Sequence, residues 1–128
     1  MGRLAQTVQD LEVYQVAFQL QQEIFGATKL WPSEETFSLT DQIRRSSRSI
    51  GANLSEAWAK RRYEAHFVSK LTDADGEVQE TFHWLITASA CGYLSDAQSA
   101  DLNPKLQSVG RLLGSMIRDY RSFCRPTE

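Results

Sequence analysis

Apolar residues recur every three or four positions along most of this chain, which is the spacing of one face of an α-helix. Alternation of the kind found in strands is nearly absent. The pattern predicts four helices, over residues 10–29, 40–61, 64–91 and 99–123. Asp10 and either Ser38 or Thr40 are the expected N-caps of the first two helices, and Gly92 is the expected C-terminal cap of the third.

The apolar faces differ among the four helices. The last carries one regular stripe, formed by Leu102, Leu106, Val109, Leu113, Met116, Tyr120 and Phe123. The first carries two, formed by Val13, Ala17, Leu20 and Ile24 and by Leu11, Tyr14, Phe18 and Phe25. Because one stripe fills one seam of a helical bundle, the apolar arc of the first helix is wider than a single bundle needs.

The links between the second and third and the third and fourth helices are short. Short links favour antiparallel neighbours, so we predict an all-α, up-down-up-down four-helix bundle. At 128 residues, with 41% hydrophobic and 23% charged residues, the chain has the size and composition of one globular domain spanning residues 1–128. Gly51 within the second helix, and Gly110 and Gly114 within the fourth, are expected at close helix contacts.

Charge and cysteine usage narrow the class of protein. The net charge of −2 argues against a protein that coats nucleic acid with its whole surface, although a local basic patch remains compatible with it. Cys91 and Cys124 are expected to be unpaired and buried. The chain shows neither a secretory signal nor a membrane span, so we expect a cytoplasmic protein without a membrane partner.

The sequence offers no positive case for an enzyme, and no catalytic residue or cofactor is predicted. The most enzyme-like spacing is Glu80-x-x-His83, with Glu77 one turn earlier, which resembles half of a metal site in a helical bundle. A di-iron site needs two such motifs, and the second histidine, His66, is not in one. Metal binding therefore stays a remote alternative to a polar stripe that pairs with arginines.

A basic stretch occupies residues 42–62, with six basic residues and one acidic residue. The candidate nucleic-acid contacts are Arg44, Arg45, Arg48, Lys60, Arg61 and Arg62. Such a run is more often a solvated or ion-paired face than a phosphate-binding one. Acidic residues of the third helix, Asp73, Asp75, Glu77 and Glu80, are available to pair with it. The stretch can bind nucleic acid only if its arginines are left unpaired on one surface.

Asn53 and Glu56 lie three residues apart near the apolar seam of the second helix. Polar groups at a packed face need hydrogen-bond partners, since an unpartnered one costs about 1–3 kcal/mol. We therefore expect the two side chains to act as a polar clasp to another helix or subunit.

Six blocks of sequence resemble one known family. They are DLEVYQ at 10–15, WPSEE at 31–35, LTDQIRRS at 39–46, SIGANLSEA at 49–57, EVQETFHWL at 77–85 and GYL at 92–94. In order and spacing they are similar to the small bacterial bundle proteins encoded in intervening sequences of 23S ribosomal RNA. Ala57 departs from the pattern, which usually has glycine there.

This resemblance implies a ring-shaped homo-oligomer, most often a homopentamer, which would cover the second stripe of the first helix. The chain is also similar to the accessory variability determinant of diversity-generating retroelements, a pentameric bundle that associates with nucleic acid. The leading hypothesis is a non-catalytic protein that binds RNA or DNA with low specificity. The alternative is a protein-protein interaction scaffold with no nucleic-acid role.

Overall fold

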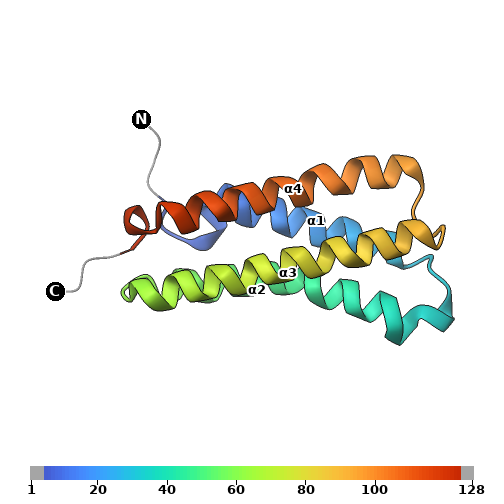
Figure 1. Cartoon of the computed structure of the whole chain (residues 1–128), viewed down its shortest axis with the longest axis horizontal. Helices are drawn as coiled ribbons and strands as arrows, with labels where there is room; N and C mark the ends of the chain where they lie inside the picture. The colour runs from blue at the N-terminus through green and yellow to red at the C-terminus, as the bar shows by residue number, and fades with distance from the viewer. Residues whose placement is uncertain (1–4, 125–128) are drawn as a thin grey trace.

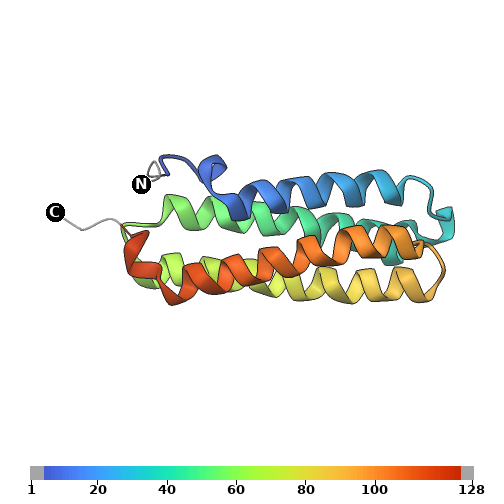
Figure 2. The same ribbon diagram turned by 90° about the horizontal axis from the view of Figure 1, so that it is seen from above.

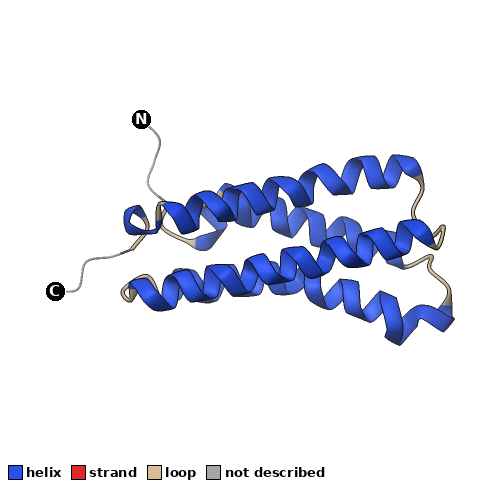
Figure 3. Cartoon of the chain, viewed as in Figure 1, coloured by secondary structure: helices blue, strands red, loops and turns tan. Residues whose placement is uncertain are grey.

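The computed structural model describes residues 5–124, and all regular structure in that range is helical (Figure 3). The four long helices are α1 (Glu12–Thr28), α2 (Asp41–Ala59), α3 (Glu64–Ala90) and α4 (Asp96–Arg118). They run up, down, up and down, and each packs against its two neighbours around the bundle (Figures 1 and 2). The predicted four-helix bundle is confirmed, and none of the described helices is long and apolar enough to cross a membrane.

Short helical turns lie at the ends of the bundle. Val8–Asp10 and Tyr120–Ser122 are 3₁₀ turns, at the end that also holds the α2–α3 turn (Figure 1). At the other end, a 3₁₀ turn (Ser33–Glu35) and a π-helical turn (Thr36–Thr40) connect α1 to α2. There the Tyr93 hydroxyl donates to Glu35 Oε2 at 2.8 Å, and this hydrogen bond, with burial, raises the pKa of Tyr93 to about 12.

The predicted inward faces form the core. Val13, Ala17, Leu20 and Ile24 of α1 are buried, as are all of the predicted α4 positions from Leu102 to Met116. In the second stripe of α1 only Phe18 is exposed, at 47%, and it stacks on Tyr14, while Leu11, Tyr14 and Phe25 are half-buried. Between α2 and α3 the core holds a polar contact, in which the buried hydroxyl oxygens of Ser46 and Thr81 are 2.9 Å apart.

The helix ends differ in detail from the sequence prediction. Leu11, not Asp10, is the N-cap of α1, because the Asp10 carboxylate accepts from the backbone N–H groups of Gln6 and Thr7 in the preceding turn. Thr40 precedes α2 without a side-chain cap, since the π-helical turn continues into the helix. Ser95 begins α4 earlier than predicted through a capping box with Gln98.

The expected close helix contacts at Gly51, Gly110 and Gly114 are corrected. A methyl group would lie 3.5 Å from Tyr14 Cε1 at Gly51 and 3.8 Å from Val78 Cγ1 at Gly110, which are ordinary contacts, and at Gly114 it would meet no described atom within 4 Å. Close helix approach therefore does not require glycine at any of these positions. Gly92 has φ +78° and ends α3 as predicted, because a left-handed residue there suits glycine. Both cysteines are free as expected, but neither is buried: Cys91, the C-cap of α3, is exposed and Cys124 is half-buried.

Candidate nucleic-acid interface

Three cations from two helices surround one aromatic ring at the surface of the α1–α2 pair. Arg44 and Arg48 lie one turn apart on α2, with their guanidinium carbons 4.7 and 5.2 Å from the centre of the Phe25 ring of α1. Lys29 Nζ lies 4.8 Å from the same ring centre. These distances fall within the range of cation–π attraction. We call Phe25, Lys29, Arg44 and Arg48 the Phe25 cluster.

Arg44 is held in this cluster by a hydrogen bond. Its Nε donates at 2.8 Å to the hydroxyl of Thr28, which is buried and itself donates to the carbonyl oxygen of Phe25. The guanidinium therefore has a defined place while most of its N–H groups are left for other acceptors. Preorganisation of this kind lowers the entropy lost when an anion binds.

An open hollow of about 420 Å³ lies beside the cluster. It is lined by Asp41, Arg44, Arg45, Arg48, Ser49 and Ala52. Within residues 5–124, neither Arg44 nor Arg48 forms an ion pair with a carboxylate, including that of Asp41. Their charge is therefore exposed to solvent and to ligands at this hollow.

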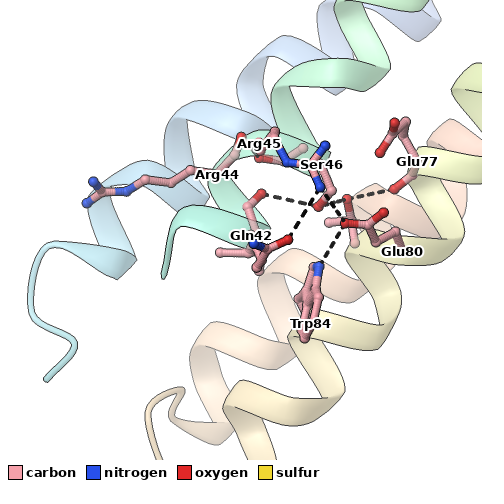
Figure 4. Close-up of polar contacts among 10 residues, drawn as sticks. Gln42, Arg44, Arg45, Ser46, Glu77, Glu80 and Trp84 are labelled. Atoms are coloured by element: carbon pink, nitrogen blue, oxygen red, sulfur yellow. Dashed lines mark hydrogen bonds and ion pairs between the residues drawn. The ribbon is translucent and has the colours of Figure 1, made fainter. Parts of the chain in front are cut away.

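Arg45 has a different environment from its neighbour. Figure 4 shows Arg45 directed toward Glu77 and Glu80 of α3, and Arg44 directed away from them. Arg45 Nη2 lies 3.7 Å from Glu80 Oε2 and donates to Gln42 Oε1 at 3.3 Å. Glu80 also accepts from the indole N–H of Trp84 at 3.1 Å. Acidic residues of α3 thus neutralise one arginine of the basic stretch, as expected for an ion-paired helix face.

Glu77 lies next to this pair and is less well satisfied. Its Oε1 is buried and has no hydrogen-bond partner within the described chain. Burial raises the pKa of the Glu77 carboxyl, the charge of Glu80 raises it further, and Arg45 opposes the change. The ionised form of Glu77 is therefore disfavoured in the folded protein.

The other three basic candidates lie at the opposite end of α2. Lys60 and Arg62 are exposed in the turn to α3, and Arg61 is half-buried. The Arg61 guanidinium carbon lies 3.5 Å from the centre of the Trp58 ring, and its Nε donates to the Trp58 carbonyl oxygen at 2.9 Å. The six candidates are therefore not one surface. They divide into the Phe25 cluster, the paired Arg45 and this group at the α2–α3 turn.

The predicted clasp is only half present within the chain. Glu56 reaches from α2 to α3, where its Oε2 lies 3.1 Å from Lys70 Nζ, and this contact raises the pKa of Lys70. The Asn53 side chain instead donates to the carbonyl oxygen of Ser49 in its own helix. It is half-buried beside the seam and makes no side-chain hydrogen bond to another described helix. Ser46 and Thr81, which sequence reasoning missed, supply the buried polar contact.

The metal-site alternative finds little support in the geometry. His83 is exposed and its ring packs edge-on against Trp84, at 4.8 Å between ring centres, while Glu80 is engaged with Arg45 and Trp84. No three His, Cys, Asp or Glu side chains of residues 5–124 gather closely enough to hold a metal ion.

Phe25, Lys29 and Thr28 are the site residues that sequence reasoning did not assign. Phe25 appeared in the second apolar stripe of the first helix, where its role was expected to be packing. In the sequence, the spacing of Phe25 and Lys29 by one helical turn indicated that they are neighbours. That spacing points to a shared site with Arg44 and Arg48 only because α1 and α2 pack side by side.

Fold and surface together define a class: an all-helical, four-helix-bundle protein with a basic cluster shared by two neighbouring helices. Residues 9–115 match the family described as 23S rRNA-intervening sequence protein, and the chain belongs to that family. A similar solved structure is a protein of unknown function from the S23 ribosomal protein family of Bacteroides thetaiotaomicron. It shares 31% identity over 83% of this chain and 95% of its own, with a TM-score of 0.74. No curated protein matches the chain.

Proposed function

We propose that this protein is a non-catalytic nucleic-acid-binding or nucleoprotein accessory protein that contacts phosphates through the Phe25 cluster. The observation that carries the proposal is the gathering of Lys29, Arg44 and Arg48 on one face, where none of the three pairs with a carboxylate of residues 5–124. Arginine side chains bind phosphate through two parallel N–H groups, and such contacts position a protein on nucleic acid without reading its sequence. The name of the family makes RNA the first nucleic acid to test.

The proposed assembly is a homopentamer in which copies of the Phe25 cluster act together. Support comes from apolar side chains that the single chain exposes, including Leu30 at 90%, Phe37 at 81% and Phe18 of the second α1 stripe at 47%. Exposed apolar surface of this kind favours association. A monomer mass by light scattering at micromolar concentration would contradict the homopentamer. It would not contradict nucleic-acid binding, which is tested separately.

The binding test compares two double variants that remove the same charge. Arg44→Ala/Arg48→Ala should weaken binding to RNA at low salt by about tenfold or more and reduce the slope of log affinity against log salt by about 1.5–2, because each phosphate contact contributes about 0.7 on single strands and about 0.9 on a duplex. Arg111→Ala/Arg118→Ala removes two exposed arginines of α4 that do not line the hollow beside the Phe25 cluster. It should change affinity by no more than about twofold, as expected for screened charges outside the contact.

Fluorescence anisotropy with labelled RNA and DNA at several salt concentrations measures both quantities. Thermal melting of each variant verifies that the fold is retained. If the wild-type protein shows no salt-dependent binding at low ionic strength, or if both double variants weaken binding equally, the proposed interface is wrong. The scaffold alternative, with no nucleic-acid role, then becomes the better description.

A further inference from the structure

The turn between α2 and α3 combines cations with an open aromatic ring. Lys60, Arg61 and Arg62 are followed by Tyr63, the N-cap of α3, whose extended backbone (φ −119°, ψ 103°) lies outside both helices. Tyr63 is 56% exposed. The ring of His66 lies one turn along α3, at 5.7 Å from the Tyr63 ring and inclined to it by 49°. We call Lys60, Arg62, Tyr63 and His66 the Tyr63 corner.

One open hollow borders the Tyr63 ring and a second borders the His66 ring. One, of about 570 Å³, is lined by Gln6, Trp58, Ala59, Arg61, Arg62 and Tyr63. The other, of about 300 Å³, is lined by Lys60, Ala65, His66, Ser69 and Lys70. A flat ligand against Tyr63 would therefore lie in a hollow that basic side chains also line, and the neighbouring hollow at His66 is basic as well.

Trp58 and Tyr63 line the same hollow but differ in availability. The Arg61 guanidinium lies 3.5 Å over the Trp58 ring and is fixed there by its hydrogen bond to the Trp58 carbonyl oxygen. That face of Trp58 is consequently covered by the protein itself. Tyr63 has no cation stacked on it among the described residues, and it is the ring of this hollow that can accept another flat group.

An exposed aromatic ring flanked by cations is the arrangement by which proteins hold single-stranded nucleic acid. Bases stack on the ring while basic side chains follow the phosphates, and the contact tolerates any base because every base has a π-face. A duplex does not offer this contact, since its bases are stacked on one another and present only their edges in the grooves. The chemistry of the corner therefore selects an unpaired nucleotide.

We propose that Tyr63 is a stacking platform for an unpaired base of single-stranded nucleic acid, with the exposed Lys60 nearby for a neighbouring phosphate. This inference rests on the proposed nucleic-acid binding and adds a preference for single strands over duplexes. The Phe25 cluster cannot supply that preference, because its ring is already surrounded by Lys29, Arg44 and Arg48.

The experiment uses three labelled DNA probes of equal length: a single strand, the same backbone with abasic sites, and the corresponding duplex. Tyr63→Ala should weaken binding to the normal single strand by roughly tenfold, within the range of about fivefold to a hundredfold that loss of one base–aromatic stack produces. It should leave the abasic strand and the duplex within about twofold, because their contacts are to phosphates. Tyr63→Phe keeps the ring and should bind like the wild-type protein.

The outcomes separate this inference from the proposed function. If the wild-type protein binds all three probes equally and the Arg44/Arg48 variant weakens all three, phosphate binding stands and the platform is wrong. If Tyr63→Ala weakens all three probes alike, or changes the mass of the assembly by light scattering, Tyr63 has a structural role and the platform is also wrong. Failure of the wild-type protein to bind any probe overturns both proposals.

Discussion

The two ends of α2 carry three basic residues each, yet they surround aromatic rings in opposite ways. At the Phe25 cluster the cations lie against the ring, so the ring organises charge and is itself covered. Next to the Tyr63 corner, among the described residues, Arg61 stacks on Trp58 and no cation stacks on Tyr63, so Tyr63 stays open. Basic residues near aromatic residues therefore do not define one kind of site. The first arrangement suits phosphates, and the second suits an unpaired base.

The largest expected effect comes from disabling both regions together. Along α2, Arg48 and the helix end before Tyr63 are separated by roughly 16 Å, because a helix rises 1.5 Å per residue. Sites that far apart have effects on binding free energy that add to within about 0.5 kcal/mol. The triple variant Arg44→Ala/Arg48→Ala/Tyr63→Ala should therefore lose affinity for single strands by about the product of the separate losses, on the order of a hundredfold.

Anisotropy titrations of the wild-type protein, the separate variants and the triple variant form a complete cycle. On the duplex, the triple variant should bind no worse than Arg44→Ala/Arg48→Ala. A coupling free energy above about 1 kcal/mol would show that the two regions act as one site and are not independent.

A smaller effect is expected from the ring that organises the first cluster. Phe25→Leu keeps an apolar side chain but removes the π-face, and exposed cation–π contacts contribute about 0.5–1 kcal/mol each. We expect affinity to fall by about threefold to tenfold for single strands and duplexes alike. Phe18→Leu is the matched control, because Phe18 lies on the same helix, stacks on Tyr14 and contacts none of these cations. If the two variants bind equally well, Phe25 does not position the cations.

The smallest effect concerns the side of α2 where acidic residues engage Arg45. The pKa of Glu77 is raised in the folded protein, so ionisation costs stability above that pKa, and the cost disappears as the pH falls toward the ordinary value of 4.5. Glu77→Gln should therefore increase the free energy of unfolding at pH 7 by up to about 1 kcal/mol. The gain should vanish near pH 4.

Urea denaturation at the two pH values measures this difference. Glu80→Gln is the control and should not stabilise the protein, because Glu80 accepts from Trp84 and pairs with Arg45. If Glu77→Gln stabilises the protein equally at both pH values, the gain in unfolding free energy does not come from the charge of Glu77. The acidic surroundings of Arg45 would then not distinguish it from the arginines of the Phe25 cluster.

Much of the fold could be predicted because helical periodicity is a local property of the chain. The spacing of Leu102, Leu106, Val109 and Leu113 identifies the buried face of α4, and all four are buried. The predicted helix bounds were wrong at the helix ends, where several nearby residues can serve as the cap. Asp10 caps the turn before α1, and Ser95 begins α4 ahead of the periodic pattern. The alternative caps differ little in free energy, and the periodicity of apolar residues does not indicate which one forms.

The amino-acid sequence alone specified which residues are basic, which helix carries them and which helical faces are apolar. These properties depend only on residue type and spacing within one helix. It did not specify the partner of each arginine. Arg44 and Arg45 are adjacent and identical, yet a rotation of about 100° per helical residue directs one toward α1 and the other toward α3. Phe25 and Arg44 are 19 positions apart and meet only because the α1–α2 connection reverses the chain. Tertiary packing therefore decided which charges are neutralised within the bundle and which are available at its surface.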